Sequence, residues 1–361
     1  MYSLTLTEYI IAFMISISVA IIATPIVKFL SLKFKIADKP NQRKVHKGLM
    51  PSAGGLAIFA GTVAGFLYLT PYSPYMTEII IAGLLIIILG VFDDKYAVSP
   101  KVKLLGQIAA AIIVASSGLQ VEFVSFPFVG RIEFGFMSFI ITVLWIVGVT
   151  NSINLIDGLD GLAAGVSTIA LGSILTMAVL DHQLVVISLA VILIGSTLGF
   201  LIFNFHPASI FMGDTGALFL GFAISVISML GLFKSVTVFS LIIPVIILAV
   251  PIFDTFFAII RRLMRKQKIS TPDKFHIHHC LLAIGFTHQS TVIIIYLLSF
   301  FFGITAILFS ASTLWGSLFL LILLLIVIQF TAELIGLIGN QRKPLINTLK
   351  KILVFTSTMK R

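Results

Sequence analysis

Residues 76–95 read MTEIIIAGLLIIILGVFDDK, an apolar run that ends in two adjacent aspartates. A helix needs about 20 apolar residues to cross the hydrocarbon core of a membrane, and this run is long enough. Similar runs recur along the chain, which is 59% hydrophobic and 11% charged, whereas soluble domains are about 25% charged. The sequence therefore predicts an all-α, polytopic membrane protein with one integral membrane domain over residues 1–361.

The apolar runs form eleven candidate membrane-spanning segments. The first has neither the basic start nor the small-residue cleavage site of a signal peptide, so we expect it to be retained. The segments cover about residues 8–30, 53–70, 76–92, 101–118, 136–153, 158–179, 184–203, 214–232, 236–262, 289–310 and 314–338.

Lysine and arginine residues indicate the orientation, because they concentrate in cytoplasmic loops. With eleven spans, all 24 of them except Arg131 and Lys234 fall on one side. This topology places the N-terminus outside and the C-terminus in the cytosol. It gives cytosolic loops over residues 31–52 and 263–288 and a basic cytosolic tail over residues 339–361. The net charge of +10 then reflects topology and contact with anionic membrane lipids, with no nucleic acid as a partner.

The aspartates gather on the same side, in the cytosolic loops and at helix ends. A carboxylate near hydrocarbon is costly unless it is paired or bound to a cation. A cytosolic site that combines aspartate with lysine, histidine and a metal ion is the simplest explanation. The residues concerned are Asp38, Asp93, Asp94, Asp157, Asp160, Asp214 and Asp273, with Asp254 slightly deeper.

Two motifs carry most of these carboxylates. The adjacent Asp93 and Asp94 suit a hard cation with oxygen ligands, and one of them can instead act as a base. In NSINLIDGLDGLAAG, residues 151–165, the spacing of Asn154, Asp157 and Asp160 places them on one broad helical face, as in a ligand-binding rim. The alternatives are that the pair only marks the end of a helix and that the second motif is a polar turn with aspartate caps.

Further polar groups lie in the other cytosolic segments. Asp214 precedes a predicted helix, where it can cap the helix or lie beside a bound phosphate. Lys44 and His46 can reach a lipid phosphate, although most charges of that loop serve the orientation. In PDKFHIHHC, residues 272–280, the histidines suit hydrogen bonds to a pyrophosphate or sugar better than zinc, because thiolate support is lacking. A solvated basic loop is the alternative. The histidines are His276, His278 and His279.

These features suit phosphoryl-type transfer from a nucleotide sugar to a membrane-bound acceptor. Such transfer needs a divalent cation on the diphosphate, cationic groups for the acceptor phosphate and in-line positioning. A secondary transporter or flippase is the alternative from another class, but transporters place carboxylates near the membrane midplane. A lipid-binding scaffold would explain the lysines but not the aspartates and histidines.

Five motifs, in order, resemble those of the polyprenyl-phosphate N-acetylhexosamine-1-phosphate transferases. They are DDK at 93–95, NLIDGLDGLAAG at 154–165, HPASIFMGDTGALFLG at 206–221, PIFDT at 251–255 and DKFHIHH at 273–279. The resemblance implies an eleven-helix bundle in the bacterial cell membrane, with Mg²⁺ as cofactor and Mn²⁺ as its substitute. It also implies UDP-GlcNAc as donor, undecaprenyl phosphate as acceptor and UMP as product. Whether a second copy of the chain is a partner, in a homodimer, is left open.

The resemblance also implies roles for individual residues. Asp93 would deprotonate or orient the lipid phosphate, Asp94 would complete the acidic pair, and Asp214 would be the clearest metal ligand. The pair Asp93 and Asp94 would join it at the metal. Lys103 would lie beside the diphosphate. The nucleotide side would consist of Asn154, Asp157 and Asp160, with help from Asn204.

The histidine segment indicates the branch of the family. HIHHCL, with no glutamate following, resembles the GlcNAc branch and within it the enzymes that start wall teichoic acid synthesis. Arg261 and Arg262 would lie near the donor sugar. The alternative within the family is transfer of phospho-MurNAc-pentapeptide. We expect Asp254 to line the site, with a salt bridge to a basic neighbour as the alternative. Direct attack by the lipid phosphate is favoured over a covalent intermediate on an aspartate.

Overall fold

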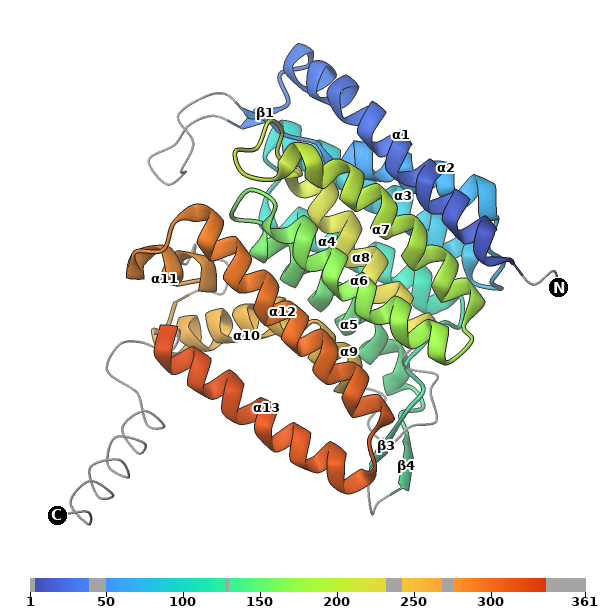
Figure 1. The fold of residues 1–361 in the computed structure, drawn as a ribbon, viewed down its shortest axis with the longest axis vertical. Coiled ribbons are helices and arrows are strands. Elements are labelled where there is room, and N and C mark those ends of the chain that lie inside the picture. The colour runs from blue at the N-terminus through green and yellow to red at the C-terminus, as the bar shows by residue number, and fades with distance from the viewer. Residues whose placement is uncertain (1–3, 39–49, 127–129, 232–241, 268–274, 336–361) are drawn as a thin grey trace.

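The structure is a computed structural model that describes residues 4–38, 50–126, 130–231, 242–267 and 275–335. Within these ranges the chain folds as a helical bundle with two short antiparallel hairpins (Figure 1). One hairpin pairs β1 (Ala37–Asp38) with β2 (Met50–Pro51), and the other pairs β3 (Phe123–Phe126) with β4 (Gly130–Glu133). The predicted all-α class is confirmed.

The helices follow one another closely along the chain. They are α1 (Leu6–Lys33), α2 (Gly55–Leu69), α3 (Met76–Tyr96), α4 (Pro100–Ser116), α5 (Met137–Ile156), α6 (Leu162–Leu180), α7 (Leu184–Asn204), α8 (Gly213–Gly231), α9 (Ile242–Ile247), α10 (Ala249–Met264), α11 (Ile277–Ile284), α12 (His288–Ala311) and α13 (Leu314–Ile335).

Eight of the described helices are long and apolar enough to cross a membrane. They are α1, α3, α5, α6, α7, α8, α12 and α13, and α2 is a shorter apolar helix. The structure is therefore that of a polytopic membrane protein, as predicted. The number of eleven spans and the orientation stay predictions.

The ninth predicted segment, over residues 236–262, differs from the expectation of one helix. Its described part consists of α9 and α10, which meet at Leu248. Pro251 explains the break, because proline lacks an N–H and its ring clashes with the carbonyl four residues earlier. That carbonyl belongs to Ile247, the last residue of α9.

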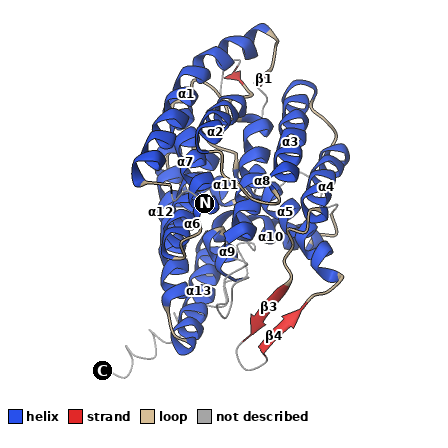
Figure 2. Cartoon of the chain, turned by 90° about the vertical axis from the view of Figure 1, so that its right-hand side faces the viewer, coloured by secondary structure: helices blue, strands red, loops and turns tan. Residues whose placement is uncertain are grey.

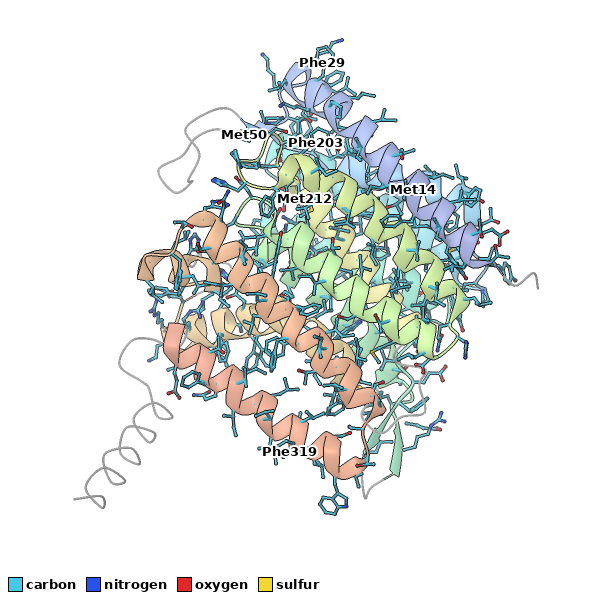
Figure 3. All side chains as sticks on the ribbon, in the orientation of Figure 1. Met14, Phe29, Met50, Phe203, Met212 and Phe319 are labelled. Atoms are coloured by element: carbon cyan, nitrogen blue, oxygen red, sulfur yellow. The ribbon has the colours of Figure 1, made fainter. Side chains whose placement is uncertain are left out.

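Helix α8 forms the centre of the bundle. It packs against α5, α3, α2, α6 and α7, and nearly all of its residues are buried. The outer helices expose apolar side chains instead, and Figure 3 shows Phe29 and Phe319 projecting away from α1 and α13. An apolar outer surface is what contact with lipid requires, because lipid tails replace water around the helices.

The two ends of the bundle differ. The hairpin of β3 and β4 projects from one end, and β1 lies at the opposite end (Figure 2). Figure 1 places α11 at the same end of the bundle as β1. The carboxyl ends of α3 and α5 and the start of α8 meet here, since Asp94 and Asn154 both contact the first residues of α8. Of the predicted aspartates, this end carries Asp93, Asp94, Asp157, Asp160 and Asp214.

Candidate active site

Four helices bring one lysine and three polar side chains together. Lys103 on α4 places Nζ 2.7 Å from Oδ2 of Asp93 on α3 and 2.5 Å from Oδ1 of Asp214 on α8. Asn154 on α5 donates its side-chain amide to the same Asp214 oxygen. The second oxygen of Asp93 accepts the backbone N–H of Val98 at 2.8 Å. All four residues are among those selected from the sequence, and the structure places their side chains in one cluster.

Asp94 has a different position from Asp93. Its Oδ1 accepts the backbone N–H of Asp214 at 2.8 Å, and its Oδ2 accepts the backbone N–H of Thr215 at 3.1 Å. The hydroxyls of Thr215 and Ser52 donate to it as well. The first N–H groups of a helix lack partners within the helix and favour a negative charge. Asp94 therefore caps α8 from a neighbouring helix and fixes the backbone that carries Asp214.

Replacing Asp94 with alanine is expected to destabilise the protein by about 1–3 kcal/mol, because it leaves buried donors at the start of α8 without partners. The thermal unfolding midpoint in detergent measures the effect. Asp181→Ala is the matched control, since Asp181 is exposed beyond the end of α6. Equal midpoints for the two variants would contradict the capping role.

Asp157 ends α5 and starts the loop that leads to α6. Burial, followed by the negative charges of Asp214, Asp94 and Asp160, raises the pKa of Asp157 to about 8. Without a compensating cation this carboxyl is therefore mostly neutral at pH 7. The same concentration of negative charge favours binding of a divalent cation nearby.

Asp160, in the same loop, is held by two histidines that the sequence analysis did not select. Asp160 Oδ2 lies 2.7 Å from His206 Nδ1 and accepts the backbone N–H of Ala208 at 3.1 Å. The backbone N–H of Asp160 donates to His288 Nε2 at 3.0 Å, and the two imidazole rings stack at 4.2 Å. These contacts join the loop after α5, the loop after α7 and the start of α12.

Asn204 strengthens the same connection. Its Oδ1 accepts the backbone N–H of Gly161 at 3.1 Å, and its Nδ2 donates to the carbonyl of Ile210 at 2.9 Å. Asn204 is buried, so the structure places it between the two loops. His206 is the first residue of the motif HPAS, so the sequence did contain a signal for it. His288 lies 128 residues from Asp160, and no motif marks it.

The histidine segment is anchored by Asp254. Its Oδ2 lies 2.8 Å from His276 Nδ1, and its Oδ1 accepts the backbone N–H of Ile277 at 2.8 Å. Asp254 is buried on α10. Both of its oxygens therefore hold the start of α11. The contact with His276 agrees with the alternative that Asp254 pairs with a basic neighbour. The expected position on the site floor stays a prediction.

His278 packs this segment against the loop after α5. A Cβ atom on Gly158 would lie 2.3 Å from His278 Nε2, so only glycine leaves room for the ring. The His279 ring contacts the His278 ring with centres 4.2 Å apart, and the two rings are tilted by 47°. Arg261 and Arg262 are buried near the end of α10. His278 thus brings the start of α11 against the loop that carries Asp157 and Asp160.

Burial lowers the pKa of His278 to about 3, with further contributions from His279, His276 and His288. The unfolded chain binds a proton below its ordinary pKa of about 6.5, and the folded chain does not. The contribution of His278 to the free energy of unfolding is therefore fully present above about pH 6.5. It decreases as the pH falls from there toward 3. At pH 5 the loss is about 2 kcal/mol.

Unfolding midpoints between pH 8 and pH 5 test this expectation. The wild-type midpoint should fall more steeply than that of His278→Gln, which has no titrating group at this position. His182→Gln, at an exposed residue, should follow the wild type. Parallel curves for all three proteins would show that His278 is not buried as a neutral group.

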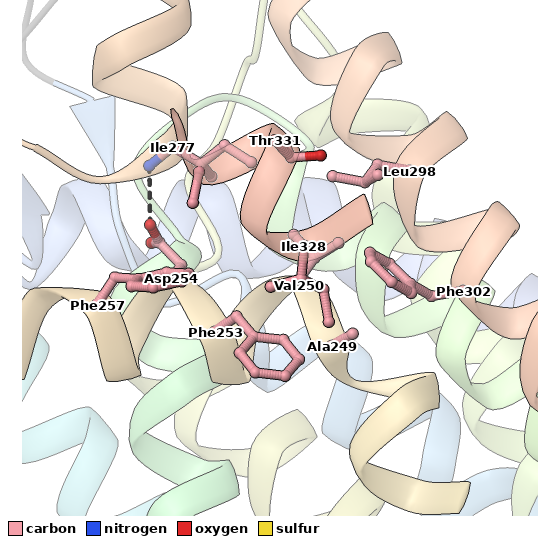
Figure 4. Close-up of a pocket in the computed structure, with 11 residues that line it drawn as sticks. Ala249, Val250, Phe253, Asp254, Phe257, Ile277, Leu298, Phe302, Ile328 and Thr331 are labelled. Carbon is pink, nitrogen blue, oxygen red and sulfur yellow. Dashed lines mark hydrogen bonds between the residues drawn. The ribbon is translucent and has the colours of Figure 1, made fainter. Parts of the chain in front are cut away.

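A small apolar pocket lies between α10, α12 and α13 (Figure 4). Asp254 lies at its edge, where it accepts the Ile277 N–H, and Phe253, Phe257 and Phe302 are among its lining residues. Apart from Asp254 and Thr331 the lining is apolar, so the pocket lacks the cationic groups that a phosphate needs. Lys44 and His46 lie outside the described residues.

Comparison with known proteins shows the family of this chain. The family model for glycosyl transferase family 4 matches residues 76–232, which contain the aspartate cluster. The chain is 52% identical over 345 residues to the probable undecaprenyl-phosphate N-acetylglucosaminyl 1-phosphate transferase of Bacillus subtilis strain 168, covering 95% of this chain and 96% of that relative. The chain therefore belongs to glycosyl transferase family 4, as the motifs indicated.

More distant relatives carry related names. The decaprenyl-phosphate N-acetylglucosaminephosphotransferase of Mycolicibacterium smegmatis is 34% identical over 306 residues, covering 76% of this chain and 75% of the relative. The undecaprenyl-phosphate alpha-N-acetylglucosaminyl 1-phosphate transferase of Yersinia pestis is 28% identical over 298 residues, covering 80% of each. All three relatives are thus named as transferases of a GlcNAc phosphate group to a polyprenyl phosphate.

Proposed function

We propose that this protein transfers GlcNAc-1-phosphate from UDP-GlcNAc to undecaprenyl phosphate, giving undecaprenyl-diphosphate-GlcNAc and UMP. The structural observation that supports the proposal is that Asp93 and Asp214 both contact one cationic group, the ammonium group of Lys103. Among the comparisons, the main support is the Bacillus relative, whose similarity covers nearly the whole chain. The reaction would be the first membrane step in synthesis of wall teichoic acid or a related envelope polysaccharide.

Mg²⁺ fits the residues present, with Mn²⁺ as a substitute. Both metals prefer oxygen ligands, and Asp93 Oδ2 and Asp214 Oδ1 already share a positive charge, the ammonium group of Lys103. Asp93 and Asp214 would hold the metal, while Asp94 fixes the backbone of Asp214. The metal ion would neutralise negative charge on the diphosphate of the donor.

Direct attack is the simplest mechanism for these residues. An oxygen of the lipid phosphate attacks the β-phosphorus of UDP-GlcNAc, the bond from this phosphorus to the bridging oxygen breaks, and UMP leaves with that oxygen. Asp93 orients the lipid phosphate or accepts its proton. Asp94 is poorly placed as a nucleophile, since both of its oxygens accept hydrogen bonds from the start of α8.

The donor would lie between the aspartates and the histidine segment. Asn154, Asp157 and the loop held by His206 and His288 would form its nucleotide side, and His279, Arg261 and Arg262 its sugar and diphosphate side. This end of the bundle would face the cytosol, with eleven spans, the N-terminus outside and the C-terminus inside. The distribution of lysine and arginine supports that orientation, and it gives a soluble nucleotide sugar access to a membrane-bound acceptor.

Release of UMP by the purified protein in detergent tests the proposal. UDP-GlcNAc and UDP-MurNAc-pentapeptide are each supplied with undecaprenyl phosphate, with and without Mg²⁺. We expect metal-dependent release of UMP when the donor is UDP-GlcNAc and no release when the donor is UDP-MurNAc-pentapeptide. Release only with the pentapeptide donor would reject the GlcNAc branch. A folded sample that releases UMP from neither donor would reject the transferase and favour a transporter.

A further inference from the structure

The position between Asp93 and Asp214 is occupied by a side chain of the protein itself. Lys103 Nζ contacts one oxygen of each carboxylate, at 2.7 Å and 2.5 Å, and its side chain is only 17% exposed. The same Asp214 oxygen also accepts the amide of Asn154. Two carboxylates that converge on one point favour a cation there, and the ammonium group supplies it.

A divalent metal ion needs the same oxygen atoms. Mg²⁺ binds carboxylate oxygens at about 2.0–2.1 Å and requires nearly octahedral geometry, whereas an ammonium group lies about 2.7–2.9 Å from its acceptor. Two cations that share one oxygen atom would also repel each other strongly. The ammonium group and the metal ion therefore compete for the position between Asp93 and Asp214.

We propose that Lys103 is an internal counter-ion of this site, which holds Asp93 and Asp214 together until a divalent cation displaces its ammonium group. Its flexible four-carbon stem allows the displaced group to move away from the two carboxylates. If the proposed function holds, that group then meets the substrate phosphates. The displacement itself does not depend on the identity of the substrate.

Binding of Mn²⁺ alone, followed by electron paramagnetic resonance of the free ion, tests the competition in the intact protein. Lys103→Met keeps most of the stem and removes the competing charge, so we expect Mn²⁺ to bind about tenfold more tightly or better. Lys103→Arg retains a cation and should not gain affinity. Lys101→Met, at an exposed lysine on the same helix, should match the wild type. Equal or weaker binding by Lys103→Met would overturn the proposal.

A measurement on the wild type covers the case in which Lys103→Met fails to fold. An amine-reactive acetylating reagent is applied with and without saturating Mn²⁺, and modification of Lys103 is measured by peptide mass spectrometry. Displacement predicts several-fold more acetylation of Lys103 with Mn²⁺ and no change at Lys101. Unchanged or decreased acetylation of Lys103 would reject displacement.

These results are separable from a test of the transferase. If the wild type releases UMP but Lys103→Met gains no Mn²⁺ affinity, the counter-ion role is wrong and the function stands. If the wild type is inactive with both donors but Lys103→Met binds Mn²⁺ more tightly, the function is wrong and the counter-ion role stands.

Discussion

Asp214→Asn is expected to lower kcat/KM for UDP-GlcNAc by about 10³-fold, a loss typical of removing one electrostatic contact to the transition state. Asp214 accepts from both Lys103 and Asn154, and it is the carboxylate that Asp94 positions through the start of α8. An amide of the same size keeps the packing but lacks the negative charge that holds a cation. The initial rate of UMP release at several donor concentrations measures the effect.

Asp181→Asn is the matched control for this variant, because Asp181 is an exposed aspartate outside the site. It should retain the wild-type rate. Binding of Mn²⁺ should weaken in Asp214→Asn, and the unfolding midpoint of the same variant separates loss of the metal from loss of the fold. If Asp214→Asn kept more than a tenth of the wild-type kcat/KM, Asp214 would not be the principal carboxylate of the site.

Gly55→Ala is expected to reduce both stability and activity. A Cβ atom on Gly55 would lie 2.1 Å from the backbone nitrogen of Gly216 and 2.3 Å from its Cα, so it would meet backbone in the first turn of α8. Overpacking of this kind costs about 1–3 kcal/mol. Because Asp214 lies in that same turn, we also expect UMP release to fall by at least tenfold, a change of about 1.4 kcal/mol in the barrier.

Gly148→Ala provides the comparison, because a Cβ atom on Gly148 has no neighbour within 4 Å. Within the helix α5 this substitution should be neutral or stabilise by up to about 1 kcal/mol. Unfolding midpoints and UMP release are measured for both variants. A Gly55→Ala protein that is as stable and active as Gly148→Ala would show that α2 does not pack this closely against α8.

The sequence was sufficient for most of the long helices and for most of the central cluster, but it did not predict α11 within the loop over residues 263–288. Apolar runs that end in polar motifs predicted α3, α5 and α8 together with Asp93, Asn154 and Asp214, because the membrane leaves few places for charge. The break between α9 and α10 was missed, although Pro251 is visible in the motif PIFDT. Hydropathy alone treats proline as one residue in an apolar run, whereas its effect on the backbone is local and steric.

Other features depend on contacts between distant segments. Asp93 and Asp94 are adjacent and therefore point about 100° apart around a helix, but only the fold shows that Asp93 faces Lys103 and Asp94 faces the start of α8. The connection of Asp160 to His206 and His288 spans three elements. No spacing rule within one helix or strand could have predicted it.

The transfer of a phosphosugar, rather than of a sugar alone, is the central claim and can be followed with one isotope. UDP-GlcNAc labelled with ³²P at the β-phosphorus is incubated with undecaprenyl phosphate, Mg²⁺ and the purified protein, and the lipid fraction is separated from the nucleotides. We predict that the label enters the lipid in step with release of unlabelled UMP. Label that remains in the nucleotide fraction as UDP, or that enters no lipid while the donor is consumed, would contradict the proposed function.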